Sequence, residues 1–179
     1  MVDVGAKEST RRIAIATTTV RFSSKAAAKL IAENSNKKGD VLGVARIAGL
    51  MAAKRTSDLI PLCHPLAISK ADVDVTLKPP AGVKDPGNTV YILTRVECVG
   101  PTGVEMEALT AATGAALTVY DMCKAIDRDM SIGDASVVYK TGGRSGTHVQ
   151  SLWRLNQGGV IYLKEHGLEN PHASSKKKE

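Results

Sequence analysis

The chain has 179 residues, of which 43% are hydrophobic but only 3% aromatic, and its formal net charge is +6. This length fits one domain, whose core must be built mainly from Ala, Val, Ile and Leu side chains. The basic excess is modest, and the chain shows neither the dense basic stripe nor the aromatic stacking platforms typical of nucleic-acid-binding proteins. We therefore expect a small anionic ligand and no nucleic acid partner.

Three cysteines, Cys63, Cys98 and Cys123, are odd in number and widely spaced. This spacing argues against a disulfide framework and favours a reducing compartment. The sequence has neither a basic N-terminal segment followed by an apolar run nor the stretch of about 18 apolar residues that a membrane span requires. We expect a soluble cytoplasmic protein without a membrane partner, although a mature organellar protein would share these features.

The first predicted element is a strand at residues 11–20, which are rich in Ile and Thr. A helix is predicted at residues 25–33, because Ser23 or Ser24 can cap its start. A turn sequence that includes Gly39 follows and ends this helix.

The second helix is predicted at residues 41–56, with Asp40 as its N-cap. We expect its core-facing side to be the apolar residues that recur at helical spacing. These are Val44, Ile47, Ala48 and Met51. Residues 58–66 contain Pro61 and Pro65, which exclude a regular helix, so we predict a rigid, extended and buried loop that forms a wall of the site.

A hairpin is predicted from strands at residues 70–77 and 89–98, joined by a Pro-rich tip at 79–87. Residues 104–126 are rich in Ala and almost entirely apolar, which predicts a long buried helix. Gly114 lies near its middle, where a glycine is tolerable if another backbone must approach closely.

A last strand is predicted at residues 135–141. The order of strand, helices, strand, strand, helix and strand predicts the α+β class with a ferredoxin-like β-α-β-β-α-β fold, an antiparallel sheet with helices on one face. We expect one domain at residues 1–146 and a C-terminal extension at 147–179 without an assigned role. The extension should end in a disordered basic tail at 174–179.

Two candidate functional residues precede the predicted hairpin. Lys38 stands before the second helix, where backbone N–H groups and the helix dipole favour a phosphate. His64 is aimed by the Pro-rich loop and could act as acid, base or hydrogen-bond donor. Considered alone, each is more often structural, and a Cys63/His64 metal pair is less favoured still because no matching Cys-x-x-Cys appears.

Four charged residues mark the ends of the long predicted helix. Glu105 and Glu107 point the same way if their stretch is extended and diverge if it is helical, and placement at a helix N-terminus explains either acid well. Asp121 and Lys124 are three residues apart and share a face. A structural ion pair and a functional pair explain Asp121 and Lys124 about equally well.

The spacing of these charges has a consequence for assembly. Glu107 and Asp121 are 14 residues apart, so on one helix they lie about 21 Å from each other along the axis. One chain cannot bring both to one small ligand. If both serve the same site, a second copy of the helix must run antiparallel across a two-fold axis, which predicts a dimer or a multiple of one.

A glycine-rich turn, Gly-Gly-Arg-Ser-Gly at residues 142–146, follows the last predicted strand, with Lys140 just upstream. Its backbone N–H groups could cradle a phosphate. The motif is weak, and it is not a Walker A sequence because the Gly-Lys-Ser/Thr ending and the following helix are missing.

Several blocks of the sequence are long enough to be specific when taken together. They are residues 1–4 (MVDV), 38–41 (KGDV), 45–49 (ARIAG), 53–56 (AKRT), 58–66 (DLIPLCHPL), 102–112 (TGVEMEALTAA), 120–125 (YDMCKA) and 140–143 (KTGG). From Met1 to about Gly146, the chain resembles the MoaC family, the cyclic pyranopterin monophosphate synthases of molybdenum cofactor biosynthesis. The Pro-rich tip and the C-terminal extension depart from the family pattern.

The resemblance implies a hexamer, a trimer of dimers, with sites at the dimer interface. The implied reaction converts (8S)-3′,8-cyclo-7,8-dihydroguanosine 5′-triphosphate to cyclic pyranopterin monophosphate with release of pyrophosphate. No cofactor or metal is implied, and a need for Mg²⁺ is left open. The implied site residues are Asp121 and Lys124 for acid/base chemistry, and Lys38, His64, Glu105, Glu107, Arg12, Lys140, Cys63 and Met106 for substrate binding.

A non-catalytic interpretation stands beside this one. Lys38, Arg144 and the basic tail would also suit an anion-binding or nucleotide-binding module. Such a module would bind with steep salt dependence, form no product and be indifferent to Asp121.

Overall fold

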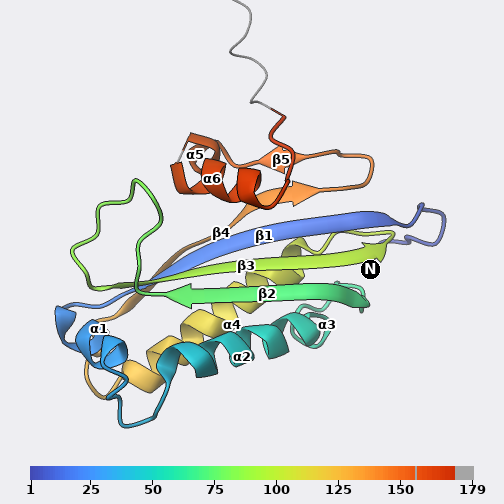
Figure 1. The fold of residues 1–179 in the computed structure, drawn as a ribbon. Helices are drawn as coiled ribbons and strands as arrows, with labels where there is room; N and C mark the ends of the chain where they lie inside the picture. Colours follow the sequence, from blue (N-terminus) through green and yellow to red (C-terminus); the bar gives the residue numbers. More distant parts are fainter. Residues whose placement is uncertain (156, 172–179) are drawn as a thin grey trace, which may run out of the picture.

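The computed structural model describes residues 1–155 and 157–171. Its frame is a five-stranded antiparallel sheet with the strand order β2-β3-β1-β4-β5 (Figure 1). The strands are β1 (Thr10–Arg21), β2 (Ile68–Thr76), β3 (Thr89–Gly100), β4 (Ser131–Thr141) and β5 (His148–Val149).

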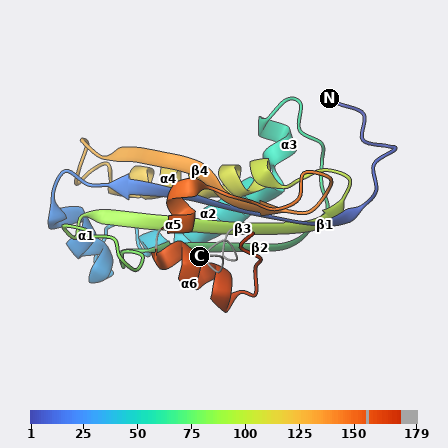
Figure 2. The same ribbon diagram turned by 90° about the horizontal axis from the view of Figure 1, so that it is seen from above.

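Helices cover both faces of this sheet (Figures 1 and 2). On one face lie α1 (Lys25–Ala32), α2 (Val41–Lys54), α3 (Thr56–Leu59) and α4 (Glu105–Cys123). On the other lie α5 (Ser151–Leu155) and α6 (Gln157–Glu165). The elements from β1 to β4 confirm the predicted ferredoxin-like fold, with its helices on one face, and the two C-terminal helices are an addition that the sequence did not predict.

The central strand β1 is apolar on both sides because both sides are covered. Ala14 and Ala16 face the larger core beneath α2 and α4, whereas Ile13 and Ile15 face a smaller core beneath the C-terminal segment. Alternation along a strand sends successive side chains to opposite faces. The small alanines therefore let α4 lie close to the sheet.

The buried face of α2 is not the predicted one. Val44, Ile47 and Met51 are 46%, 62% and 42% exposed, and the residues that face the core are Val41, Ala45, Gly49 and Ala53. Small residues occupy the buried face of α2 because they let the backbones of α2 and α4 approach closely. A Cβ added at Gly49 would lie 3.0 Å from the carbonyl oxygen of Ala111 in α4.

The long helix α4 confirms the predicted alanine-rich core helix, although it is shorter at its C-terminal end. Its alanines at positions 108, 111, 112, 115 and 116 are fully buried. Gly114 faces α2, where an added Cβ would lie 2.6 Å from Cβ of Ala52. The predicted close approach of another backbone is therefore present, and α2 supplies it.

The loop with the two prolines is more exposed than predicted. Helix α3 already occupies Thr56–Leu59, so the irregular segment starts later, and Leu62 within it is 71% exposed. Cys63 and His64 are half-buried. The predicted buried wall is wrong for most of this loop, because only its second half turns toward the core.

The C-terminal segment continues the fold as far as it is described. Val149 and Leu163 pack with Tyr139 of β4 and with the Ile13 and Ile15 side chains. The predicted disordered tail at residues 174–179 lies outside the described residues. Within residues 1–155 and 157–171, none of the helices is both long and apolar enough to cross a membrane.

Candidate functional site

Four of the predicted site residues lie at the two ends of α4, one of the helices that cover the sheet in Figure 1. Glu105 and Glu107 lie in its first turn. Asp121 lies in its last turn, and Lys124 caps its C-terminal end. At 1.5 Å per residue, Glu107 and Asp121 are about 21 Å apart along the axis, so a single chain carries two separate clusters.

The cluster at the C-terminal end of α4 consists of one carboxylate held between two ammonium groups. Nζ of Lys124 lies 2.7 Å from Oδ1 of Asp121, and Nζ of Lys38 lies 2.7 Å from Oδ2. Lys38 also donates a hydrogen bond of 2.9 Å to the main-chain carbonyl of Asp121. Three of the predicted site residues, from two segments of the chain, are thereby brought together.

A buried asparagine places Lys38 in this cluster. Oδ1 of Asn36 accepts a hydrogen bond of 2.8 Å from the backbone N–H of Lys38, and its Nδ2 donates to the carbonyl of Met122 at 3.3 Å. The turn before α2 is therefore tied to the end of α4. Asn36 was missed in the sequence, because an asparagine in a turn is usually only a turn former.

The ion pairs in this cluster shift the pKa values of Asp121 and Lys124. Hydrogen bonds from Lys124 and then Lys38 lower the pKa of Asp121 to about 2, and the same contact with Asp121 raises the pKa of Lys124. The cluster holds two lysine side chains and one carboxylate, so its cations outnumber its anion. Because all three side chains are about half-exposed, the excess positive charge can meet an incoming anion.

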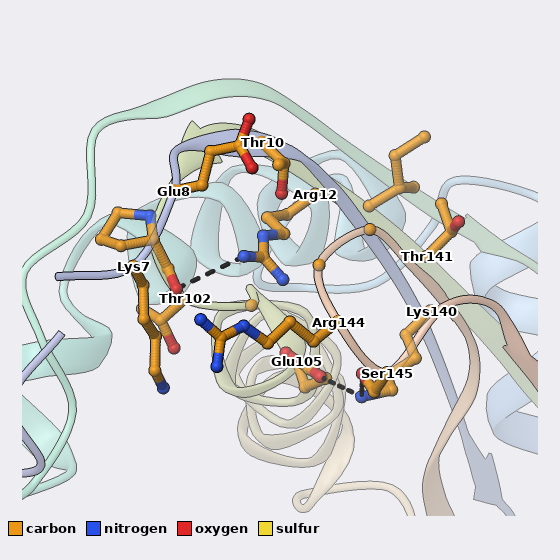
Figure 3. Close-up of a pocket in the computed structure, with 15 residues that line it drawn as sticks. Lys7, Glu8, Thr10, Arg12, Thr102, Glu105, Lys140, Thr141, Arg144 and Ser145 are labelled. Carbon is orange, nitrogen blue, oxygen red and sulfur yellow. Dashed lines mark hydrogen bonds and ion pairs between the residues drawn. The ribbon is translucent and has the colours of Figure 1, made fainter.

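The cluster at the N-terminal end of α4 borders a cavity of about 620 Å³ (Figure 3). Arg12, Glu105 and Lys140 were predicted and lie in its wall. The complete lining is Lys7, Glu8, Thr10, Arg12, Ile13, Pro101, Thr102, Gly103, Glu105, Lys140, Thr141, Gly142, Gly143, Arg144 and Ser145.

Two of the basic side chains in this cavity already have partners. Nζ of Lys140 lies 3.3 Å from Oε1 of Glu105 and donates to Oγ of Ser145 at 3.0 Å. Arg12 donates to the main-chain carbonyls of Gly100 and Pro101 at 3.2 and 3.3 Å. These contacts hold β1, β4 and the start of α4 together around the cavity.

The double glycine after β4 is required by its backbone conformation and, at Gly142, by the backbone of β1 beside it. Gly142 and Gly143 have φ of +101° and +72°, a region that favours glycine. A Cβ at Gly143 would collide with the guanidinium group of Arg12, and one at Gly142 with the backbone carbonyl of Arg11. The glycine-rich turn therefore lets an arginine lie flat against the backbone.

Glu105 and Glu107 diverge, because this stretch is helical. Glu105 borders the cavity, whereas Glu107 is only 4% exposed. Burial, and then the charge of Glu105, raise the pKa of Glu107. The pKa of Cys63 is raised by burial and then by the charge of Glu107, so the Pro-rich loop lies beside this carboxyl group.

Two of the remaining predicted residues lie outside the cavity lining. His64 and Met106 are half-buried and do not belong to the cavity lining. Among the described residues, no group of three or more His, Cys, Asp and Glu side chains is placed to hold a metal ion. The arrangement is suited to binding polyanions and moving protons.

The model of the MoaC family matches residues 1–143 of the chain. The chain belongs to the MoaC family. A relative from Parvibaculum lavamentivorans, a cyclic pyranopterin monophosphate synthase, is 54% identical over 148 residues, which cover 83% of this chain and 88% of that protein.

The matched part of this MoaC chain includes all the predicted site residues, and it stops before Arg144 and Ser145 of the cavity lining and before α5 and α6. Lys7, a wall residue of the cavity, was missed as a site candidate. Its signal was its place between the motif at residues 1–4 and Arg12. A lysine in an irregular N-terminal segment carries no periodic pattern, so only the fold shows what it faces.

Proposed function

We propose that this chain is a cyclic pyranopterin monophosphate synthase, a cytoplasmic lyase of molybdenum cofactor biosynthesis. Its substrate is (8S)-3′,8-cyclo-7,8-dihydroguanosine 5′-triphosphate, and its products are cyclic pyranopterin monophosphate and pyrophosphate. Family membership and the 54% identical relative support this reaction. The observation that carries the proposal is that α4 bears one charged cluster at each end.

The complete site forms between two copies of the chain. An antiparallel α4 from a second copy places its Lys38, Asp121 and Lys124 cluster opposite the cavity beside Glu105, because both clusters lie at the ends of the same helix. Apolar side chains exposed on α2 and α4 support such a contact, since water-exposed apolar patches mark interaction surfaces. They are Val44, Ile47, Met51 and Leu117. Three such dimers make the proposed hexamer.

Most of the polar groups bind the triphosphate and stabilise its departing charge. Arg12 and Lys140 from one copy, and Lys38 and Lys124 from the other, surround the phosphate groups with cations. His64 donates a further hydrogen bond from the loop beside Cys63 and Met106.

The carboxyl groups and Lys124 serve the proton transfers of ring opening and closure. Lys124 is charged at neutral pH and can donate a proton, while ionised Asp121 can accept one. Their mutual ion pair restrains both, so substrate phosphate must compete for Lys124 before either group acts. Glu105 recognises the guanidine-like edge of the base, and Glu107, with its raised pKa, relays protons.

Turnover of the purified protein tests this proposal. Wild-type protein given the cyclic dihydro-GTP triphosphate should release pyrophosphate and cyclic pyranopterin monophosphate. Asp121→Asn and Lys124→Ala should each lower kcat at least about 100-fold, the usual contribution of a proton-transferring group, with unchanged circular dichroism. Lys29→Ala and Asp72→Asn, exposed on α1 and β2, are matched controls that should keep full activity.

Two outcomes would contradict the assignment. Full activity of the Asp121 or Lys124 variant removes that residue from the chemistry. Tight, salt-sensitive nucleotide binding by the wild-type protein without any product, and without a response to Asp121→Asn, supports the non-catalytic anion-binding module instead.

A further inference from the structure

The turn before α2 caps the C-terminal end of α4. The last carbonyl groups of a helix have no partner within the helix itself. In α4 the carbonyl of Asp121 accepts a hydrogen bond of 2.9 Å from Nζ of Lys38, and the carbonyl of Met122 accepts one of 3.3 Å from Nδ2 of Asn36. The carbonyls on either side of this pair accept backbone N–H groups from the segment after the helix. Two side chains of one turn therefore complete the cap.

Asn36 also shapes the turn from within. Its Oδ1 accepts a hydrogen bond of 2.8 Å from the backbone N–H of Lys38, and its main-chain carbonyl accepts one of 2.9 Å from the N–H of Gly39. Gly39 has φ of +91°, a conformation that favours glycine. One asparagine thus fixes the backbone at Lys38 and at the residue after it.

Burial distinguishes Asn36 from the side chain that it places. Asn36 is 8% exposed, and its Nδ2 also lies 3.8 Å from Sγ of Cys123, which belongs to the larger core. The side chain of Lys38 is 45% exposed. A long lysine side chain loses much rotamer freedom when it is held in one ion pair. A fixed backbone beneath it reduces the freedom that remains to be lost.

The two lysines of the cluster reach Asp121 in different ways. Lys124 follows Asp121 by three residues at the same helix end, so the geometry of the helix alone brings the two together. Lys38 is 83 residues away from Asp121 in the sequence. Within residues 1–155 and 157–171, the side-chain hydrogen bonds that join its turn to α4 are those of Asn36 and of Lys38 itself. The place of Lys38 therefore depends on a contact that Lys124 does not need.

We infer that Asn36 is the positioning residue for Lys38, because it holds the turn on the end of α4 so that the lysine ammonium group meets the carboxylate of Asp121. This inference rests on the proposed function, since it assigns a role within the same site. Asn36 touches neither the substrate nor the reacting atoms and acts through Lys38. Its removal should leave the pair of Asp121 and Lys124 in place and release the third member of the cluster.

A double-mutant cycle on the full-length protein tests this inference. Asn36→Ala should lower kcat/KM for the cyclic dihydro-GTP triphosphate by about 10-fold, the range expected when a hydrogen bond to a charged group is lost. Lys38→Met should lower it at least as much. Because Asn36 acts through Lys38, the double variant should be no less active than Lys38→Met alone.

Two further variants separate the link to α4 from the turn itself. Asn36→Asp keeps an acceptor for the N–H of Lys38 but cannot donate to the carbonyl of Met122, so it should lose activity as Asn36→Ala does. Asn34→Gly is the matched control in the same turn. Asn34 is exposed and has φ of +48°, which glycine adopts readily, so this variant should keep wild-type activity.

NMR titration of the Asp121 carboxyl group gives a measurement without turnover. Hydrogen bonds from Lys124 and then Lys38 hold the pKa of Asp121 low. Asn36→Ala should therefore raise this pKa toward its ordinary value, and Asn34→Gly should leave it unchanged. A general loss of stability would not produce this difference in a folded protein.

The outcomes separate this inference from the proposed function. Losses that multiply in the double variant would overturn it, and so would an Asn36→Ala protein with wild-type activity and an unchanged Asp121 titration. A wild type that forms no product would overturn the proposed reaction alone. The titration then decides the inference, because a raised Asp121 pKa in Asn36→Ala supports it and an unchanged one overturns it.

Discussion

Asp121 shows how one carboxylate can organise two lysines. Its two oxygens are each 2.7 Å from a different ammonium group. Charge-assisted hydrogen bonds of this kind stabilise the ionised form of the acid. The residue thus holds both lysines in place until a stronger anion arrives, which links the geometry of the free protein to substrate binding.

The pairing of Asp121 with the two lysines can be tested by titrating its carboxyl group. The pKa of Asp121 is about 2 in the folded chain, below its ordinary value of 3.8, so its pairing stabilises the fold above about pH 4 and this contribution is lost as the pH falls toward 2. Carboxyl NMR titration should give a low pKa in the wild type and higher values in Lys124→Met and Lys38→Met. An Asp121 pKa that is unchanged in both variants would contradict the pairing.

At the scale of elements, the contact between α2 and α4 depends on small residues. Gly49 and Gly114 each face the other helix, and the alanines around them complete the interface. Close backbone approach leaves the larger apolar residues of α2 on the outside. The same packing that buries α4 therefore also creates the surface proposed for the second copy.

A substitution at Gly49 tests this packing. Gly49→Ala should destabilise the protein by about 1–3 kcal/mol, because the new methyl group meets a backbone carbonyl that cannot move aside. Helix propensity alone predicts the opposite effect, an increase of about 1 kcal/mol in stability when alanine replaces glycine. Urea unfolding measures the difference. Gly133→Ala in β4, where the added Cβ would meet only Thr19 at 3.9 Å, should change stability by less than about 0.5 kcal/mol.

The packing of α6 against the sheet can also be tested by a substitution. Leu163 of α6 is 2% exposed and belongs to the smaller core above the sheet. Leu163→Ala should cost about 2–4 kcal/mol through lost burial and the cavity it leaves, measured by urea unfolding. The exposed neighbour Ile161 offers a control, since Ile161→Ala should have little effect. Equal stability of the two variants would mean that α6 does not pack on this face.

At the scale of the whole molecule, the length of α4 separates the two charged clusters of one chain. In the dimer proposed above, each copy would contribute the groups at one end of its helix to one site and the groups at the other end to a second site. An isolated subunit would keep both clusters but could not apply them to the same ligand. The proposal therefore predicts that activity depends on assembly.

Complementation between inactive variants tests this arrangement. Co-expressed Glu107→Gln and Asp121→Asn chains should form mixed dimers in which one of the two sites is intact, so roughly a quarter of wild-type activity should return. Asp121→Asn co-expressed with Lys124→Ala is the matched control. Both changes lie in the same cluster, so every mixed site is damaged and activity should stay absent. A site built within one chain would restore nothing in either mixture.

The sequence by itself determined the order of the elements from β1 to β4, apart from the short helix α3, and their ferredoxin-like arrangement. Local signals were sufficient here, such as the caps at Ser24 and Asp40 and the alanine periodicity of α4. The spacing of Glu107 and Asp121 also determined that two clusters must lie far apart on one helix. Residue types and fixed rise per residue carry this information without tertiary contacts.

Only the tertiary structure decided which face of α2 is buried, what covers Ile13 and Ile15, and what surrounds the cavity. Val44 and Gly49 are both compatible with a core helix in sequence, and the choice depends on how closely α4 approaches. The partners of Asn36 and the place of Lys7 depend on segments that are distant in sequence. Such contacts are set by the packing of the whole chain, because they leave no periodic trace in any one segment.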